Sequence, residues 1–480
     1  MNRKYLRHWL LLAALAGLLG ACSDNSGGDS PQTATDPVVT RTASQQGTAG
    51  GFADYDGDGV DDLFVGAPYA AVSTGRVGAV FVYQGSAAGF AADVTWTLTG
   101  DDNFGYQFAS AGDIDGDGVA EFAVTALNGD GDAASLCGSV TVYRGGGSGQ
   151  ILAKLGGEQA LDKFGYSLTG SCDLNADGFG DLVVGAISHS PSPETYLGGA
   201  VYVYFGPDLA EASRVKLPAT EHTGILGFSS ACGDIDNDGT DDLVISAIWT
   251  HGVRWHASQV LAYYGGAGFA PTTDAADVVI ASTASHFGDG LAVLDDLDGD
   301  GFREIAIGVP SFYVIPFPME THKGVVYVVK GGAGARTVNL SPPRGEPFPA
   351  DLLTTIYGAV HQERFGSTVL ALDDLDGDGV GEFAVSALHA DATGATGLSS
   401  GRVTGKVYVF LNGDVQTDGS ATMAEDLAAD RHLYRAERDL HYGTFVAPFE
   451  QGGVAKLLVG APTANRLTGT VYVETLPDGQ

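Results

Sequence analysis

The sequence repeats one acidic nine-residue stretch six times, and no other feature limits the possible folds as strongly. The copies read DYDGDGVDD, DIDGDGVAE, DLNADGFGD, DIDNDGTDD, DLDGDGFRE and DLDGDGVGE, and they begin at Asp54, Asp113, Asp173, Asp234, Asp296 and Asp374. Successive copies begin 59, 60, 61, 62 and 78 residues apart. A nearly constant period of this length indicates a repeat architecture, in which each unit buries its apolar face against its neighbours.

Each acidic stretch is followed by two segments with the pattern of β-strands. Twelve residues after the first Asp, an apolar run ends at GAP, TAL, GAI, SAI, GVP or SAL. The next segment alternates β-branched and aromatic residues, as in AVFVY, SVTVY, AVYVY, QVLAYY, VVYVV and KVYVF. Most acidic stretches are preceded by a Phe-Gly pair, beginning at Phe104, Phe164, Phe287 or Phe365. A seventh unit near the C-terminus keeps the strand patterns and lacks the acidic stretch.

The Phe-Gly and Gly-Ala-Pro landmarks resemble the FG-GAP repeats of the integrin α-subunit N-terminal region. The resemblance covers nearly all of the chain after about residue 37. It implies an all-β fold over residues 37–480, a seven-bladed β-propeller of four-stranded antiparallel blades. The count of strands and turns per unit also favours a propeller. A β-sandwich with acidic hairpins is the alternative, but it does not account for the constant offset.

The two ends of the chain contain complementary parts of one unit. The last unit stops at VYVETLPDGQ without a fourth strand, whereas DPVVTRTASQQG precedes the first acidic stretch and has the pattern of that missing strand. We therefore predict that Val38 to Ala43 completes the last blade. Such pairing would close the ring and leave no exposed sheet edge there.

The acidic stretch has the ligand pattern of a calcium loop. Carboxylates at positions 1, 3 and 5 converge, Gly at position 6 permits a sharp turn, the carbonyl of position 7 adds a ligand and position 9 closes the site. A set of oxygen ligands alone favours Ca²⁺, so up to six ions are predicted. Loop by loop, the predicted ligands are Asp54, Asp56, Asp58, Val60 and Asp62; Asp113, Asp115, Asp117, Val119 and Glu121; Asp173, Asn175, Asp177, Phe179 and Asp181; Asp234, Asp236, Asp238, Thr240 and Asp242; Asp296, Asp298, Asp300, Phe302 and Glu304; and Asp374, Asp376, Asp378, Val380 and Glu382.

The predicted metal role is structural. Carboxylates that lie this close repel one another without a cation, so Ca²⁺ should stiffen each turn. Asn175 replaces an Asp in the third loop and should weaken that site modestly. The alternative is that Asp-Gly is merely favourable hairpin-turn chemistry. Six copies with one ligand register favour the metal.

The charge of the chain limits its partners. It contains 59 Asp and Glu against 24 Lys and Arg, which gives a formal charge of −35. Such a surface repels nucleic acid and anionic lipid headgroups, and no nucleic-acid partner is expected.

The first 21 residues have the pattern of a signal peptide. A basic start precedes WLLLAALAGLLGA, which is too short to span a membrane. LGAC, which ends at Cys22, resembles the bacterial lipobox and implies cleavage before Cys22 and its lipidation. Residues 22–36 then form a flexible tether, and the lipid is the only membrane contact expected. These features imply a bacterial cell envelope, most simply the outer membrane. An ordinary signal peptide with an incidental Cys is the alternative.

Three cysteines remain in the predicted mature domain, Cys137, Cys172 and Cys232. An odd number cannot pair fully, so the core is not a disulfide scaffold. Cys172 and Cys232 occupy nearly equivalent places, and a bridge between them is possible in an oxidising compartment. Two buried thiols are the expected state.

A candidate partner-binding surface lies opposite the calcium loops. Because neighbouring strands are antiparallel, the acidic loops and the loops that follow GAP lie at opposite ends of the strands. Aromatic and basic residues concentrate in three of the latter loops: Tyr196, Trp249, His251, Arg254, Trp255, Phe312, Tyr313 and Phe317. Such residues on exposed loops are typical binding anchors. In integrins this face carries ligand recognition. The alternative is that these aromatics pack on one another to order long loops. The insertions near residues 331–360 and 412–440 have no readable chemistry.

No enzyme motif is convincing. GLSSG at Gly397 matches a nucleophile-elbow pattern, but no helix follows it, and no HExxH or Walker-type loop is present. The expected function is a lipid-anchored, calcium-stabilised module that binds a protein partner or adheres to a surface. A glycan-binding, lectin-like propeller is the second hypothesis, and a hydrolase is the least favoured.

Overall fold

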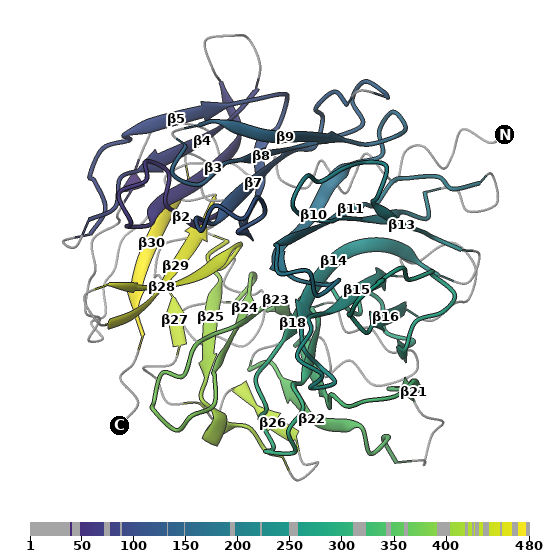
Figure 1. Ribbon diagram of the computed structural model, residues 1–480. Coiled ribbons are helices and arrows are strands. Elements are labelled where there is room, and N and C mark those ends of the chain that lie inside the picture. The colour runs from purple at the N-terminus through teal and green to yellow at the C-terminus, as the bar shows by residue number, and fades with distance from the viewer. Residues whose placement is uncertain are drawn as a thin grey trace, which may run out of the picture. The chain divides into compact units, whose positions relative to one another are not determined.

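The computed structural model of the chain describes residues 39–40, 49–71, 77–86, 89–131, 133–147, 149–192, 197–220, 223–248, 258–310, 323–341, 347–359, 363–390, 404–417, 421–424, 427, 432–434, 441–451, 454–462 and 469–476. The chain divides into two compact units, Met1–Thr35 and Asp36–Gln480. All described residues lie in the second unit, and the following account concerns it alone (Figure 1).

The described residues form strands almost exclusively, with one 3₁₀ turn, η3 (Asn412–Asp414). The first three repeats contain β2 (Gly50–Ala53), β3 (Asp62–Ala71), β4 (Val77–Tyr83) and β5 (Trp96–Thr99); β6 (Phe104–Gly112), β7 (Glu121–Ala126), β8 (Ser139–Tyr143) and β9 (Ile151–Gly156); and β10 (Phe164–Cys172), β11 (Asp181–Ala186), β12 (Ala200–Tyr204) and β13 (Val215–Pro218). The fourth and fifth contain β14 (Ile225–Gly233), β15 (Asp242–Ile248), β16 (Ser258–Tyr263) and β17 (Val278–Ser282); and β18 (Leu291–Val293), β19 (Ile305–Val309), β20 (Val325–Val329) and β22 (Leu352–Tyr357). The last two contain β23 (Phe365–Ala371), β24 (Phe383–Ala387), β25 (Lys406–Phe410) and β27 (His432–Tyr434); and β28 (Val446–Gln451), β29 (Val454–Ala461) and β30 (Thr470–Thr475).

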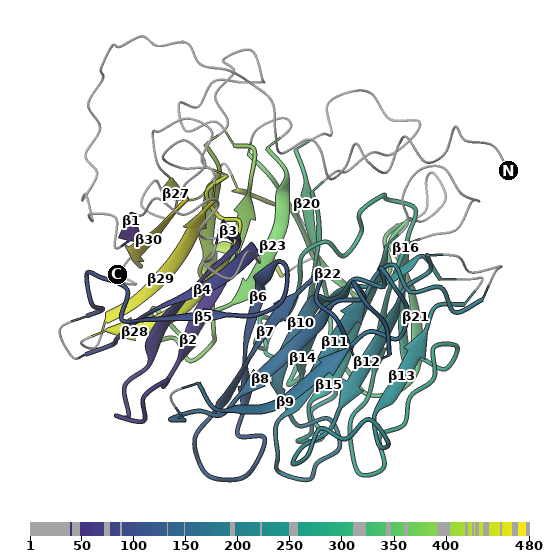
Figure 2. The same ribbon diagram turned by 90° about the horizontal axis from the view of Figure 1, so that it is seen from above.

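Within each repeat the strands form an antiparallel meander, so that the first strand pairs with the second and the second with the third. The second and third strands are the most buried. Every residue of β7, β8, β11, β12, β24 and β25 is buried. Continuous Val, Ala and aromatic runs suit these positions, because neighbouring sheets cover both faces. Figure 2 shows β6, β7, β10, β11, β14 and β15 side by side. The fold is an all-β propeller with four-stranded antiparallel blades.

Glycines explain the Phe-Gly and Gly-Ala-Pro landmarks. The Gly of each Phe-Gly pair packs against the small residue that begins the preceding repeat's GAP-like run, which is Gly66 for Gly105, Thr125 for Gly165 and Ser246 for Gly288. A Cβ on Gly66 would collide with the carbonyl oxygen of Gly105. The same collision would occur between Gly185 and Gly227 and between Gly308 and Gly366. The two landmarks therefore mark the closest approach of successive blades.

The sequence predicted seven separate four-stranded sheets, and the structure divides the strands differently. The strands form five separate sheets and one eight-stranded sheet in which β2–β5 and β6–β9 are joined. The junction is a single parallel residue pair, Gly78 with Phe104. Equivalent contacts between Gly199 and Leu226 and between Gly324 and Phe365 remain isolated bridges. Backbones of successive repeats approach closely at this point, so sheet boundaries depend on one hydrogen-bonded pair.

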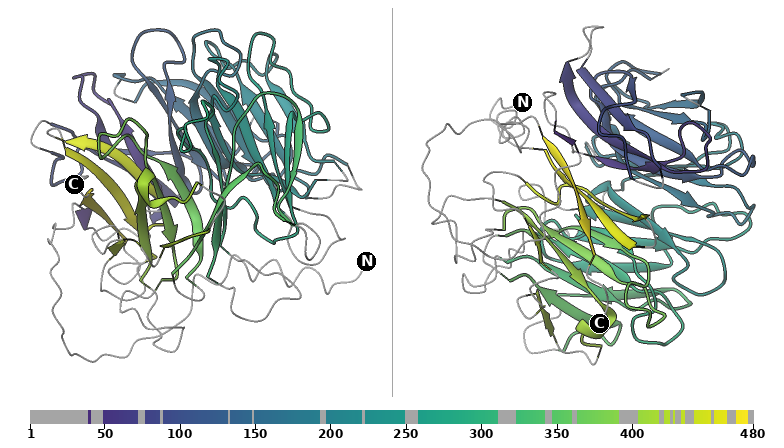
Figure 3. Two further views of the ribbon diagram at one scale, coloured as in Figure 1. Left: turned by 90° about the horizontal axis from the view of Figure 1, so that it is seen from below. Right: turned by 90° about the vertical axis from the view of Figure 1, so that its left-hand side faces the viewer.

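The first strands of the repeats surround a common centre. β2, β6, β10, β14, β18, β23 and β28 each contact the next, and β28 also contacts β2. The last strands lie beside the first in Figure 1 and in the right-hand view of Figure 3. At this junction β1 (Val39–Thr40) pairs antiparallel with β30, Val39 opposite Val471 and Thr40 opposite Thr470. The predicted pairing of the chain's two ends is confirmed at these two residues, and the rest of residues 38–43 lies outside the described residues.

An aromatic cluster packs at the same junction. The rings of Phe52, Phe90 and Phe449 lie with centroids 4.8 to 5.7 Å apart. They line a cavity of about 410 Å³ together with Val60 and Pro448. The first and last repeats are therefore joined in two ways, by the backbone pairing of the two residues of β1 and by the burial of these large apolar side chains.

The two insertions that had no reading in the sequence contribute strands. β21 (Arg336–Asn339) adds a fifth strand to the preceding blade by pairing in parallel with β17. β26 (Ala421–Met423) does the same for the next blade by pairing with β22. Each insertion therefore covers the outer edge of the blade before it, which limits exposed edge pairing.

Cys172 and Cys232 form a disulfide between β10 and β14, with their Cα atoms 6.1 Å apart. The expectation of two buried thiols was wrong. Equivalent residues of neighbouring first strands lie side by side around the centre, so near-equivalent cysteines come within bonding range. Cys137 is a buried free thiol.

Candidate metal centres and the opposite face

The six acidic loops lie on one face of the propeller. Each connects the first strand of a repeat to its second, as residues 54–61 connect β2 to β3. Because the first strands surround the centre side by side, their ends lie on the same face. The starts of the first strands therefore lie on the other face.

The backbone of each loop is organised by its own carboxylates. In every loop the position-1 Asp accepts the amide of the position-6 Gly, at 2.8 to 2.9 Å. The position-5 Asp accepts the amide of position 7, at 2.8 to 3.1 Å. The position-6 glycines have φ of +85° to +93°, a conformation that side chains other than Gly rarely adopt. The repeated geometry confirms one shared loop design.

The acid at position 9 is buried in all six loops, with at most 1% of its surface exposed. It accepts the backbone amide of position 2, for example Leu297 N to Glu304 at 2.7 Å and Ile235 N to Asp242 at 2.7 Å. Burial, together with a smaller contribution from the charges of the loop aspartates, raises the pKa of Glu304 to about 8. The same causes raise the pKa of Asp242 to about 7. A nearby cation would remove this penalty on the charged form.

Position 9 divides the loops into two classes. Where it is Asp, both carboxylate oxygens have partners, as Asp62 accepts Tyr55 N at 3.0 Å and Gly85 N at 2.7 Å. Where it is Glu, one oxygen is buried without a hydrogen-bond partner in the described part of the chain. This holds for Oε1 of Glu121, Glu304 and Glu382. A buried acceptor without a partner is costly, and a metal ion in the loop would satisfy it.

Five of the loops bring carboxylate oxygens within 4.8 Å of one another. The groups are Asp54, Asp56 and Asp58; Asp113, Asp115 and Glu121; Asp234, Asp236 and Asp242; Asp296, Asp298, Asp300 and Glu304; and Asp374, Asp376, Asp378 and Glu382. In the third loop, Asn175 donates instead to Asp177 at 2.9 Å. The residues present thus fit a divalent cation with oxygen ligands, and the position-7 carbonyls remain predicted ligands.

Basic side chains reach two of the loops, which the sequence did not predict. Lys330 forms an ion pair with Asp298 and lies 3.5 Å from Asp300. Arg144 forms an ion pair with Asp115. At the equivalent place in the first repeat, Gln84 donates to Asp56 at 2.8 Å. All three residues directly follow the third strand of their repeat, so the sequence shows that their positions are equivalent. It does not show that their side chains reach the acidic loop.

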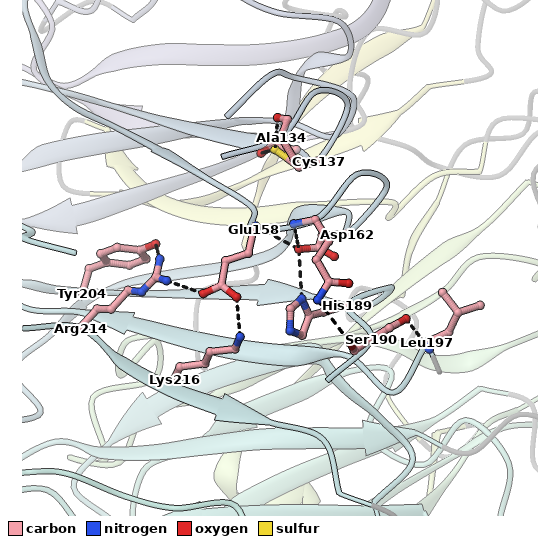
Figure 4. A network of polar contacts seen from close by, with 12 residues as sticks. Ala134, Cys137, Glu158, Asp162, His189, Ser190, Leu197, Tyr204, Arg214 and Lys216 are labelled. Atoms are coloured by element: carbon pink, nitrogen blue, oxygen red, sulfur yellow. Dashed lines mark hydrogen bonds and ion pairs between the residues drawn. The ribbon is translucent and has the colours of Figure 1, made fainter. Parts of the chain in front are cut away.

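The opposite face carries a buried polar network in the third repeat (Figure 4). Asp162 and His189 are each 1% exposed, with Nδ1 of His189 3.1 Å from Asp162 Oδ2. Asp162 also accepts the amides of Glu158 at 3.0 Å and Gln159 at 2.8 Å. The Glu158 carboxylate pairs with Arg214 and, at 2.5 Å, with Lys216. These satisfied partners hold the turn before β10 in place, which is a structural role.

The predicted partner-binding residues cannot be placed. Tyr196, Trp249, His251, Arg254, Trp255, Phe312, Tyr313 and Phe317 all lie outside the described residues. The same holds for Cys22 and for Ser399, the central residue of GLSSG. The described residues contain no helix long and apolar enough to cross a membrane.

Comparison with known proteins agrees with the landmarks. The FG-GAP repeat family model matches residues 46–83, 164–204 and 287–329, which belong to the first, third and fifth repeats. Integrin alpha-PS5 of Drosophila melanogaster is 33% identical over 180 residues, covering 34% of this chain and 17% of that protein. Integrin alpha-5 of Xenopus laevis is 29% identical over 238 residues, covering 48% and 20%. This chain carries an integrin-like FG-GAP propeller.

A bovine protein is similar over a longer part of the FG-GAP propeller. Phosphatidylinositol-glycan-specific phospholipase D of Bos taurus is 27% identical over 407 residues, covering 77% of this chain and 46% of the enzyme. The matches therefore span less than half the length of each of these relatives. Among solved structures, Saccharomyces cerevisiae Sqt1 covers 91% of this chain and 87% of its own, with a TM-score of 0.42 and 11% identity.

Proposed function

We propose that this chain is a lipid-anchored, calcium-stabilised propeller outside the cytoplasm that binds a protein partner or adheres to a surface. The observation that carries the proposal is the contrast between its two faces. Six loops of one design occupy one face, whereas the connections at the other face differ from repeat to repeat. Uniform loops suit a structural task, and varied loops on a rigid scaffold suit recognition.

We further propose seven blades in a closed ring. Counting the eight-stranded sheet as two blades gives seven, because one residue pair joins its halves. The contact cycle of the first strands and the pairing of β1 with β30 support closure. Closure would remove two sheet edges that could pair with other chains.

Calcium is proposed in up to six loops, held by the carboxylates at positions 1, 3, 5 and 9. Bound Ca²⁺ would neutralise part of the carboxylate charge. The chain's own contribution is to hold the oxygens close through the backbone amides described above. The unpaired Oε1 atoms of Glu121, Glu304 and Glu382 support a ligand in those three loops. The third loop is expected to bind most weakly.

We assign no catalytic activity to this propeller. The similarity to integrin α-subunits supports a protein partner, and the formal charge of −35 argues against nucleic acid. The proposed location, a bacterial envelope and most simply its outer membrane, depends on the lipobox-like LGAC at Cys22. Membrane contact would be made through the lipid alone.

Affinity capture tests the proposed function. The calcium-loaded mature chain, immobilised through its C-terminus, is exposed to envelope extract and, separately, to a glycan array. Saturable capture of a defined protein supports the proposal, and the Trp249→Ala/Trp255→Ala variant should capture less. Retained capture by that variant excludes the proposed sector. Binding to glycans alone would instead identify a lectin-like propeller.

A further inference from the structure

A second set of equivalent positions lies on the face opposite the calcium loops. The residue immediately before the Phe-Gly pair, or its Tyr-Gly equivalent, has positive φ in five repeats. These residues are Asn103, Lys163, His286, Arg364 and His441, with φ between 46° and 65°. Gly, Asn and Asp adopt this conformation most easily, and bulkier side chains pay a steric cost there.

The chain places basic side chains at this costly backbone position. Four of the five residues are Lys, Arg or His, although the whole sequence has only 24 Lys and Arg and 11 His among 480 residues. Backbone strain retained at equivalent positions is a reason to suspect function. Asn103, Lys163 and Arg364 immediately precede the first strands β6, β10 and β23. His286 and His441 lie five residues before β18 and β28. The first strands contact one another around the centre, so these residues approach it from the same face.

Some of these side chains interact with neighbouring polar or aromatic groups. His286 Nδ1 lies 3.2 Å from Asp289, and the charge of Arg364 acts on both residues. The rings of His389 and His441 stack with centroids 5.8 Å apart. Burial, and then the charge of Arg364, lower the pKa of His389 to about 4. We call Lys163, His286, Arg364 and His441 the axial basic cluster.

Aromatic residues line the neighbouring part of the centre. Tyr106, Tyr166 and Phe228 each stand one residue after the Gly of a Phe-Gly or Leu-Gly pair. Their rings contact in series, with centroids 6.0 and 5.1 Å apart. Burial raises the pKa of Tyr166 well above its usual value, and the charges of Tyr106 and Asp289 add to this. Tyr166 lies on β10, which contacts β14, and β14 contacts β18, the strand that follows His286. All three aromatics keep part of their surface exposed.

Arg364 is the cation best placed to take a ligand. It is exposed, and its guanidinium makes no hydrogen bond or ion pair within the residues that the structure describes. Lys163, by contrast, donates to Asn128. Asp289 offsets one positive charge, and its carboxylate already contacts His286. An unpaired guanidinium suits a carboxylate, and partly exposed aromatic rings on other first strands suit an apolar group next to it in the ligand.

We propose that the axial basic cluster binds a carboxylate presented by the protein partner, from an Asp or Glu side chain or a chain end. Arg364 makes the principal contact, and Tyr106, Tyr166 and Phe228 pack against the neighbouring residue. This site deepens the proposed function and rests on it, since it states which chemical group the partner presents. The formal charge of −35 repels a carboxylate from much of the surface, so exposed cations here provide local attraction.

The test uses the whole, calcium-loaded chain and an array of octapeptides with blocked ends and no charged residue other than the one varied. Each peptide carries one Glu, Gln or Lys between two apolar residues. Loss of a charge-assisted hydrogen bond reduces binding by about tenfold or more, so the Glu series should exceed the Gln series by about that factor. Arg364→Asn should remove the preference, because Asn keeps the left-handed backbone at low cost, as Asn103 does. Lys154→Met, which removes an exposed lysine paired with Asp101, should retain it.

Two results would overturn the site. Equal binding of the Glu and Gln series by the unaltered chain is one, and an undiminished preference in Arg364→Asn, with unchanged melting temperature, is the other. Lys163→Asn provides a second variant should Arg364→Asn fold poorly, and it should weaken the preference. The proposed function is judged separately by capture from envelope extract. Capture that is equal for the unaltered chain and Arg364→Asn rejects this site while leaving the partner-binding function intact.

Discussion

The two faces of the propeller are built on opposite ends of the same first strands, and they differ in what the repeats share. At the acidic-loop end, six loops repeat nearly the same set of oxygen-bearing side chains, the same glycine conformation and the same hydrogen bonds from backbone amides to Asp. At the other end, five repeats share a backbone conformation while the side chains vary from Asn103 to Arg364. Repetition of side chains indicates a task performed in every blade. Where only the backbone conformation is repeated, each blade can present a different side chain.

Chelation should have the largest effect. Removing Ca²⁺ leaves clustered carboxylates unneutralised, and loss of several bound ions should lower the melting temperature by on the order of 15 °C. Calorimetry with and without EDTA, followed by readdition of Ca²⁺ or Mg²⁺, measures this. Recovery is expected with Ca²⁺. A melting curve that ignores the chelator would refute the metal assignment and with it the structural reading of this face.

Deletion of residues 37–44 should have the next largest effect. It removes β1, which pairs with β30 where the first and last repeats meet. Loss of closure should lower the melting temperature by several degrees, about 3 to 6 °C. A Gly-Ser replacement of the same length is the control for tether length and should melt like the deletion. An unchanged melting temperature would show that the ring does not need this strand.

A pair of variants compares the faces directly. Glu304→Gln preserves the shape of a buried position-9 side chain and removes its charge, so it should lower calcium stoichiometry by one and the melting temperature by about 2 to 4 °C. Arg364→Asn alters the opposite face and should change the melting temperature by less than about 1 °C. Titration calorimetry and thermal melts measure both. If the two variants lowered the melting temperature equally, the assignment of a structural role to one face and a recognition role to the other would be wrong.

The smallest expected effect distinguishes loops within the calcium face. Lys330 supplies a positive charge to the fifth loop through Asp298. Lys330→Met should therefore tighten calcium binding there, by about threefold to tenfold at low ionic strength. Gln84→Met in the first loop removes a neutral donor and serves as the control. Terbium luminescence competed with Ca²⁺ reports the affinities. Weaker binding in Lys330→Met would show that the lysine supports the site and does not compete with the ion.

Local patterns predicted the repeated parts of this protein. Alternating apolar residues and Asp-Gly turns specify strands and loops through interactions between residues close in the chain. The hydrogen bond from the Gly59 amide to the Asp54 carboxylate is of this kind. The Phe-Gly landmark could be read as a motif, but its packing against Gly66 in the preceding repeat could not. The basic residues before that landmark can also be found in the sequence, but the sequence did not predict a role for them. Their shared left-handed backbone conformation is known only from the structure.

The sequence by itself therefore determined the repeat, its strands and the carboxylate register of the acidic loops, because these depend on neighbouring residues and on the chemistry of oxygen ligands. The tertiary structure alone decided which distant groups meet. It joined Cys172 to Cys232, carried Lys330 to Asp298, merged the first two blades at Gly78 and used β21 and β26 to cover the blades before them. Such contacts join residues up to 66 positions apart in the sequence, as Ala421 pairs with Thr355, and only the packing of blades around a centre fixes them.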